Sequence, residues 1–219
     1  MLDRPPLSAN RTAMIESQLK PCGVIDPRVL QAMAAVPRED FVAQGRRALA
    51  YADLEQPLAP GRAMMTPLTL GLMVQAARVE PGERALVVGA GTGYAAAVLG
   101  RMGAEVVALE ESPTLAARAR ALVAGHGRVT VVEGPLARGA PDRAPFDLIL
   151  IDGAAERLPA ELVAQLDPRG RLVAVIVDED GVHRLGLGRA SPAGVAFDWL
   201  AELHAPPLEA LRAPPMFRF

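Results

Sequence analysis

Residues 84–110 read RALVVGAGTGYAAAVLGRMGAEVVALE, and this stretch decides the fold of the chain. An apolar run at 85–88 leads into the turn Gly89-Ala90-Gly91-Thr92-Gly93, which precedes a predicted helix at 94–101. A second apolar run at 106–109 ends on the acid Glu110. The order strand, glycine turn, helix, strand, acid is typical of the nucleotide-binding half of a doubly wound α/β sheet.

The same stretch indicates the kind of ligand. Glycines let the backbone approach a ligand without a Cβ in the way, and an acid ending the next strand can accept hydrogen bonds from two ribose hydroxyls. The spacing is G-x-G-x-G, not the G-x-G-x-x-G of pyrophosphate sites. This favours S-adenosyl-L-methionine, which has a ribose but no phosphate, over NAD; the alternative is a glycine turn that binds nothing. The residues expected to bind the cofactor are Gly89, Ala90, Gly91, Gly93 and Glu110.

Composition narrows the remaining classes. The 219 residues carry a formal net charge of −2 with the basic residues spread out, which argues against nucleic-acid binding. A single cysteine, Cys22, excludes an internal disulfide framework, and we interpret it as a buried or incidental thiol. The histidines His126, His183 and His204 lack the spacing of a metal site, and we expect none. The N-terminus lacks the apolar core of a signal peptide, so we expect a cytoplasmic monomer without a membrane span.

The remaining chain predicts alternating helices and strands. Proline after a capping residue predicts helix starts at Asp26-Pro27, Thr66-Pro67 and Ser112-Pro113. Further helices are expected at 10–20 and 159–166, and further strands at 129–132, 146–151, 171–177, 182–187 and 195–203. Residues 41–67 are expected to be a functional loop with short irregular structure. Residues 1–9 are expected to be a loose lead-in, and the proline-rich end a covering tail.

The expected architecture is therefore a doubly wound, mostly parallel seven-stranded sheet covered on both faces. N-terminal helices precede it and an antiparallel hairpin ends it. We divide the chain into 1–80, the N-terminal helices and active-site loop, and 81–219, the Rossmann-like core, which together form one compact domain.

Four stretches carry a resemblance to a known family. They read MIESQLKPCGVIDPRVLQAMAAVPREDFV at 14–42, AYADLEQPLAPG at 50–61, LVVGAGTGYAAAVL at 86–99 and FDLILIDGAAERLPAELVAQLDPRGRLV at 146–173. With them the chain resembles the protein-L-isoaspartate O-methyltransferase family, class I methyltransferases that methyl-esterify isoaspartyl residues of damaged proteins. The resemblance implies S-adenosylmethionine as cofactor, peptides or proteins with isoaspartyl carboxylates as substrates, and a cofactor role for Gly134.

The chain also departs from the family pattern. The family loop Gly-Gln-x-Ile-Ser-Gln-Pro reads GRAMMTP at 61–67, which places Met65 where the family has a serine. Pro135 stands where an acid is expected near adenine, and Val88 where an acid usually ends the first strand. These departures leave open an alternative function, a catalytically impaired pseudoenzyme that binds cofactor or protein partners.

Methylation of a carboxylate depends on how the acceptor oxygen is aligned with the methyl group more than on acid–base catalysis. A carboxylate with a pKa near ~4 is already ionised at neutral pH, so no general base is needed. In place of the serine, Arg62 can pair with the substrate carboxylate and Thr66 can donate a hydrogen bond. The alternatives are a solvated surface arginine and a helix N-cap. The candidate catalytic residues are Arg62, Met65 and Thr66. Asp152, at the carboxyl end of a predicted strand, lies where such sheets place ligand and substrate groups. The favoured alternative is that it caps the following loop through an Asx-turn.

Overall fold

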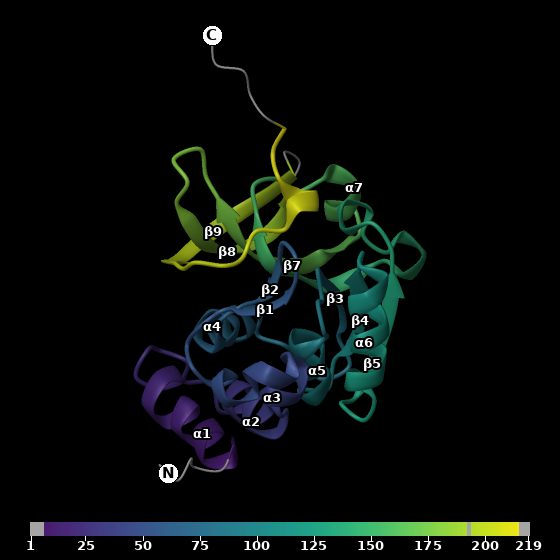
Figure 1. The fold of residues 1–219 in the computed structure, drawn as a ribbon. Coiled ribbons are helices and arrows are strands. Elements are labelled where there is room, and N and C mark those ends of the chain that lie inside the picture. Colours follow the sequence, from purple (N-terminus) through teal and green to yellow (C-terminus); the bar gives the residue numbers. More distant parts are fainter. Residues whose placement is uncertain (1–6, 192–193, 215–219) are drawn as a thin grey trace.

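The computed structural model describes residues 7–191 and 194–214, which fold around a seven-stranded sheet (Figure 1). The strand order is β5-β4-β3-β6-β7-β8-β9, parallel from β5 to β7 and antiparallel from β7 to β9. The strands are β3 (Arg84–Val88), β4 (Glu105–Glu110), β5 (Arg128–Glu133), β6 (Phe146–Ala155), β7 (Leu166–Val177), β8 (His183–Ser191) and β9 (Gly194–Glu202). The expected fold class is confirmed.

The sheet has its topological switch point between β3 and β6. The chain adds β4 and β5 on one side of β3, and β6 and β7 on the other. Crossover connections leave in opposite directions at such a point, which opens a crevice at the carboxyl ends of the two strands. Gly89 follows β3, and Asp152 lies in β6 just beyond its last pairing with β3 at Ile151. Gly89 and Asp152 therefore lie side by side at this crevice.

The helices begin where local signals predict. Asp26, Thr66 and Ser112 each accept a hydrogen bond from a backbone N–H in the first turn, and a proline follows each of them. This arrangement satisfies one donor of the first turn and presets the backbone of the next residue. The helices are α1 (Leu7–Met14), η1 (Ile15–Leu19), α2 (Pro27–Ala35), α3 (Arg38–Phe41), η2 (Gln44–Leu49), α4 (Pro67–Ala77), α5 (Tyr94–Arg101), α6 (Pro113–Val123), η3 (Leu136–Arg138), η4 (Pro141–Arg143), α7 (Ala160–Val163) and η5 (Glu209–Leu211).

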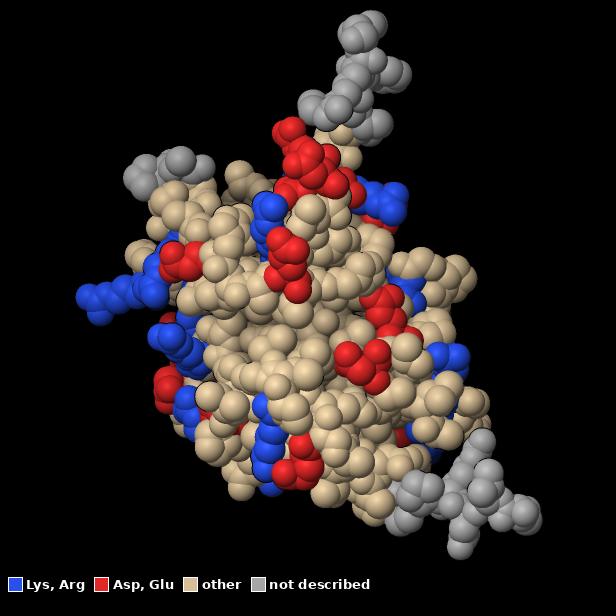
Figure 2. All heavy atoms as spheres, turned by 90° about the vertical axis from the view of Figure 1, so that its left-hand side faces the viewer, with Lys and Arg blue, Asp and Glu red and all other residues tan. Residues whose placement is uncertain are grey.

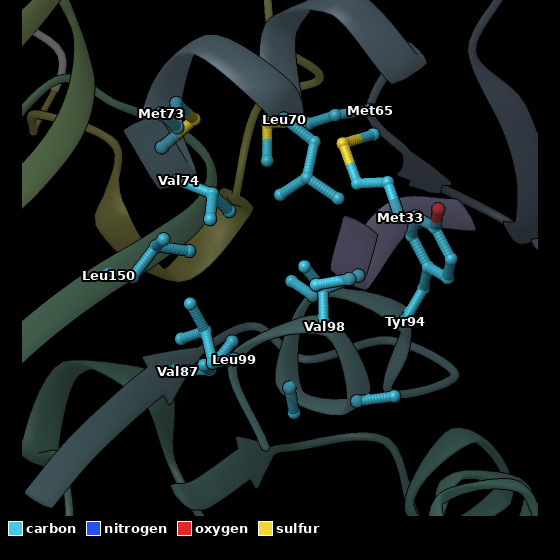
Figure 3. Close-up of a cluster of buried hydrophobic side chains, with 14 of the residues drawn as sticks. Met33, Met65, Leu70, Met73, Val74, Val87, Tyr94, Val98, Leu99 and Leu150 are labelled. Carbon is cyan, nitrogen blue, oxygen red and sulfur yellow. The ribbon is translucent and has the colours of Figure 1, made fainter. Parts of the chain in front are cut away.

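Strand side chains alternate between two apolar clusters, one on each face of the sheet. In β3, Val87 belongs to the first cluster and Leu86 and Val88 to the second. The first cluster packs against α4 and α5, where side chains of both helices interdigitate above Val87 and Leu150 (Figure 3). The second packs against η3, α7 and the C-terminal segment around Leu208. Alternation in strands buried on both faces is what a parallel sheet requires.

Four local expectations need correction. Residues 41–67 are not all irregular, because β1 (Gln56–Ala59) and β2 (Arg62–Met64) form a separate antiparallel hairpin. The helix expected at 159–166 is only the single turn α7, because Leu166 pairs with Phe146 and already belongs to β7. The helix expected at 10–20 begins earlier, at Leu7, and continues as the π-turn η1. Cys22 is exposed, so it is not a buried thiol.

Both chain ends extend beyond the described part. Of the lead-in expected at 1–9, residues 7–9 belong to α1, and 1–6 lie outside the described residues. Of the expected covering tail, Leu208 and Leu211 are buried in the second cluster. Residues 215–219 of that tail lie outside the described residues.

Candidate active site

The glycine turn after β3 has the backbone that its sequence predicts. Gly89, Gly91 and Gly93 have φ values of +79°, +57° and +93°, where side chains with a Cβ are strained. Space is restricted as well: a Cβ on Gly91 would lie 2.7 Å from Leu58, and one on Gly93 would lie 2.6 Å from Val123. The N–H of Ala90 donates to the carbonyl of Leu109, which ties the turn to β4.

Glu110, the last residue of β4, is held beside this turn by the backbone. Its carboxylate is fully buried and accepts hydrogen bonds from the N–H groups of Gly91 at 2.7 Å and Ser112 at 2.9 Å. Two backbone donors fix the position of the carboxylate. The remaining acceptor capacity of Glu110 faces the crevice, which is where a ribose diol can be bound.

Arg62 occupies that acceptor capacity. From β2 it donates to both oxygens of Glu110, from Nη1 at 2.7 Å and Nη2 at 2.8 Å, and Nη2 also donates to the carbonyl of Gly89 at 3.0 Å. Its side chain is 11% exposed. The interpretation of Arg62 as a solvated surface group is therefore wrong. Arg62 forms the bidentate carboxylate pair expected of it, but with a carboxylate of its own chain.

The other two loop candidates have structural partners. Thr66 caps α4 by accepting a hydrogen bond from the N–H of Thr69 at 3.2 Å, as its N-cap interpretation states. Met65 is buried in the first apolar cluster (Figure 3) and its carbonyl accepts a hydrogen bond from Arg38.

The sequence interpretation missed Arg38. Its guanidinium is fully buried, lies 5.0 Å from the ring centre of Tyr94, and also donates to the carbonyl of Ala50 at 2.8 Å. It thereby joins the two ends of the loop that contains β1 and β2. The sequence offered no clear signal, because Arg38 stands in the charged run Arg38-Glu39-Asp40 between Pro37 and Phe41.

Asp152 lines a small cavity with the glycine turn, Met64 and Tyr94. Its expected Asx-turn is absent: within the described residues its carboxylate is influenced by buried surroundings and neighbouring charges, and by no hydrogen bond. Burial raises the pKa of Asp152 to about 7; Arg62 and Arg38 oppose that rise and Glu110 adds to it. The crevice therefore holds a carboxyl that is easily protonated at neutral pH.

Gly134 lies at the far side of Glu110. Its N–H donates to the carbonyl of Glu110 at 3.1 Å, and it lines a separate hollow with Leu109, Pro135 and Arg138. Gly134 thus borders the acid of β4, while Pro135 offers neither a carboxylate nor a backbone donor there.

The donor and acceptor set fits S-adenosylmethionine, but the space is filled by side chains. Glu110 provides acceptors for two ribose hydroxyls, and the Gly89 carbonyl provides a further acceptor. The cavity encloses about 200 Å³ and is too narrow for a water molecule. Leu58, Leu208 and Arg62 lie above the glycines. A larger hollow between α7 and β9 contains none of the candidate catalytic or cofactor-binding residues. The switch-point crevice, the glycine turn and the ribose-type acid together define a class I S-adenosylmethionine-dependent methyltransferase.

Known proteins give the particular family. The sequence model of the protein-L-isoaspartate(D-aspartate) O-methyltransferase family matches residues 9–187. A protein-L-isoaspartate O-methyltransferase of Methylorubrum extorquens is 44% identical over 186 residues, which cover 84% of this chain and 82% of that protein. Protein-L-isoaspartate O-methyltransferase 1 of Rhodopseudomonas palustris is 39% identical over 209 residues, covering 94% and 85%. The chain belongs to the protein-L-isoaspartate(D-aspartate) O-methyltransferase family.

Solved structures agree on the fold. A protein-L-isoaspartate O-methyltransferase superposes with a TM-score of 0.78 at 24% identity, covering 92% of this chain and 67% of that one. A Plasmodium falciparum protein assigned to the same enzyme, solved with S-adenosyl-L-homocysteine, gives a TM-score of 0.77 at 22% identity, covering 92% and 99%. These two structures confirm the expected fold.

Two features are absent from the described residues. In residues 7–191 and 194–214, no helix has the length and apolar character to cross a membrane. In the same ranges no three His, Cys, Asp or Glu side chains gather as metal ligands, although His183 and His204 stack with ring centres 4.5 Å apart.

Proposed function

We propose that this chain transfers the methyl group of S-adenosylmethionine to the isoaspartyl carboxylates of peptides and proteins, as a monomeric cytoplasmic enzyme. The observation that carries the proposal is Glu110, a buried carboxylate fixed beside a glycine turn at the switch point of the sheet. The proteins named above, which are 39–44% identical, carry this activity in their names. On the face drawn in Figure 2, acidic and basic side chains are interspersed around an uncharged centre, which suits a protein substrate better than a nucleic acid.

The cofactor side of the site consists of the glycine turn together with Glu110 and Gly134. The proposed cofactor-binding residues are Gly89, Ala90, Gly91, Gly93, Glu110 and Gly134. In this arrangement Glu110 accepts hydrogen bonds from the ribose, and the glycines leave room for the backbone to come close to the ligand. The bound cofactor supplies an electrophilic methyl group on a sulfonium.

On the acceptor side, the loop residues position the substrate carboxylate. With Glu110 holding the ribose, Arg62 would be released from that carboxylate, and its guanidinium would pair with the incoming substrate carboxylate. Thr66 contributes by fixing the start of α4, and Met65 by excluding water and by anchoring the loop to Arg38 through its carbonyl. No base is required, because the acceptor is already ionised; alignment and exclusion of water provide the rate enhancement.

The test combines cofactor binding with methylation. We expect calorimetry to give a micromolar dissociation constant for S-adenosylmethionine, and Glu110→Gln to weaken it by about 10–100-fold, because it loses charge-assisted hydrogen bonds to the ribose. Glu111→Gln is the matched control, since Glu111 is 36% exposed and 4.0 Å from Arg62. The protein should then methylate an isoaspartyl peptide and not its aspartyl counterpart. Cofactor binding without methylation would instead support the pseudoenzyme alternative.

A further inference from the structure

The backbone of β6 directs Asp152 toward the crevice through a bulge. Leu150 pairs with Val173, yet Ala154 already pairs with Val175, so three residues of β6 stand opposite one residue of β7. Bulges of this kind change the direction of a side chain and occur beside active sites. Here the bulged segment contains Asp152 and Gly153, and Asp152 lines the cavity beside Gly89–Thr92.

The C-terminal segment holds this bulge in place. Ala154 forms two backbone hydrogen bonds with this segment. The N–H of Ala154 donates to the carbonyl of Pro206 at 2.8 Å, and the carbonyl of Ala154 accepts from the N–H of Leu208 at 3.0 Å. Gly153 has φ +155°, and a Cβ there would lie 2.8 Å from Leu208 and 2.9 Å from the Pro206 carbonyl. The direction of Asp152 is therefore set by backbone contacts on both sides of it.

Asp152 is the acidic side chain of this cavity, and it remains available to a substrate. The hydroxyl of Thr92 donates to the carbonyl of Phe41 at 2.7 Å, and the methionine and alanine of β2 that line the cavity have no donor. Outside the lining, the hydroxyl of Thr66 is committed to the cap of α4. Tyr94 also lines the cavity; its ring centre lies 5.0 Å from the guanidinium of Arg38, and its buried hydroxyl has no hydrogen-bond partner among the described residues. Asp152 likewise has no hydrogen-bond partner among the described residues and is 9% exposed.

The charges around Asp152 come from four elements. Arg62 on β2 and Arg38 on α3 attract its carboxylate, Glu110 on β4 repels it, and the neutral phenol of Tyr94 on α5 borders it. An acceptor carboxylate placed beside Asp152 adds a second negative charge. Two carboxyl groups at close range share a proton instead of both being ionised.

We propose that Asp152 binds the methyl-acceptor carboxylate as a neutral carboxylic acid, donating its O–H to one acceptor oxygen while the other oxygen attacks. This inference rests on the proposed function, and it names the specificity-determining group of that site. The free acceptor oxygen provides the electron pair of the new O–CH₃ bond, the methyl–sulfur bond breaks, and its electron pair returns to sulfur as a neutral thioether. The proton of Asp152 stays on Asp152 throughout. The neutral ester product accepts a hydrogen bond more weakly, which favours its release.

The consequence is a pH dependence of substrate binding. The acid form donates and the ionised form repels the acceptor, so KM should rise as the pH increases through the pKa of Asp152, about 7. Between about pH 6 and about pH 8 we expect KM for an isoaspartyl peptide to rise about tenfold with little change in kcat, because the peptide carboxylate is ionised throughout.

Two substitutions separate this role from a structural one. Asp152→Asn keeps a donor that does not titrate, so its KM should stay low and flat over the same pH range. Asp152→Ala should give a high, flat KM. Asp198→Asn makes the same chemical change at an exposed position on β9 and should keep the wild-type profile. Cofactor dissociation constants measured by calorimetry for each variant show that the fold and the cofactor site are intact.

The outcomes distinguish this inference from the proposed function. If the wild-type protein methylates the peptide but its KM is flat with pH, or if Asp152→Asn keeps the wild-type profile, the role of Asp152 is overturned and the proposed function stands. If the protein binds cofactor and does not methylate the peptide, the proposed function is overturned, and the role of Asp152 with it.

Discussion

In the pair of Arg62 and Glu110, the guanidinium of Arg62 occupies the carboxylate oxygens to which the cofactor's ribose is expected to bind. A guanidinium makes stronger hydrogen bonds to a carboxylate than neutral hydroxyls do. Cofactor binding therefore replaces a strong internal interaction with weaker external ones. The measured affinity is the difference between the two, so the cofactor-free protein sets part of the dissociation constant.

Replacing Arg62 should consequently strengthen cofactor binding. For Arg62→Gln we expect the dissociation constant of S-adenosylmethionine to fall about tenfold, or about 1.4 kcal/mol. The cofactor-free protein should lose about 1–3 kcal/mol of stability, because Glu110 stays buried without its cation. Calorimetry and thermal unfolding with and without cofactor measure both effects. Arg47→Gln, which removes an exposed pair with Asp40, is the control. Weaker cofactor binding in Arg62→Gln would show that Arg62 holds the cofactor.

The residues that could be predicted from sequence are those whose partners are close along the chain. Glu110 and the glycine turn lie within one strand–helix–strand unit, so their spacing alone identifies them. The partner of Arg62 is 48 residues away and depends on a hairpin that the sequence did not indicate. Asp152 was recognised as a strand-end acid, but its bulge depends on Pro206 and Leu208 from the other end of the chain.

Among the elements, α5 and the loop that precedes β5 touch backbone to backbone. A Cβ on Gly100 would lie 2.4 Å from the carbonyl oxygen of His126, and one on Gly127 would lie 2.4 Å from the carbonyl of Gly100. Two glycines facing each other thus set the distance between the helix that carries the glycine turn and the strand beside β4.

Gly100→Ala should therefore destabilise the protein although alanine is the better helix former. The gain in helix propensity is about 1 kcal/mol, and the forced separation should exceed it, leaving a net loss of about 1–3 kcal/mol. Urea unfolding measures the change. Gly45→Ala is the control, because a Cβ at this exposed position meets nothing within 4 Å. Equal stability of Gly100→Ala and the wild type would mean that the loop moves aside freely.

Elements with strong local start signals could be predicted, and those defined by tertiary pairing could not. The three helices that begin at a capping residue plus proline start where expected. The hairpin of β1 and β2 was missed because its strands have only four and three residues, with a register shift between Pro57 and Ala59. The length of α7 was overestimated because Leu162 and Leu166 are spaced as on a helix. In the structure Leu166 instead pairs with Phe146 in the sheet.

In the whole molecule, the N-terminal helices and the Rossmann-like core are joined by a common apolar cluster and by hydrogen bonds. Met33 and Met65 from the first 80 residues pack in the same cluster as Val87 and Leu150 (Figure 3). Arg171 of β7 donates to the carbonyls of Ala77 and Arg78 at the end of α4, and it pairs with Glu83 through both nitrogens. We therefore predict that 1–80 and 81–219 unfold in one cooperative transition.

The ion pair of Arg171 and Glu83 should give this transition an acid-sensitive component. Burial tends to raise the pKa of Glu83, but hydrogen bonds from Arg171 and from the Glu80 backbone outweigh it, so the pKa is lowered. Such a carboxylate stabilises the fold above its unfolded pKa of about 4 and loses that contribution as the pH falls through its folded pKa. We expect Glu83→Gln to cost about 1 kcal/mol at neutral pH and almost nothing near pH ~2.

Unfolding in urea as a function of pH checks this sign. Glu105→Gln is the control, because Glu105 pairs with Arg128 at a site where the two side chains are 40% and 75% exposed. A constant difference between Glu83→Gln and the wild type at all pH values would show that packing, and not charge, is responsible.

The hairpin of β1 and β2 forms no ladder with the seven-stranded sheet. It can swing away from the glycine turn, carrying Arg62 and Leu58 with it, without breaking a hydrogen bond of the main sheet. Glu110 and Asp152, by contrast, belong to strands that pair with a neighbour on both sides. The side chains of Leu58 and Arg62, which cover the crevice, thus come from a separate hairpin, whereas those at its base come from the strands of the main sheet.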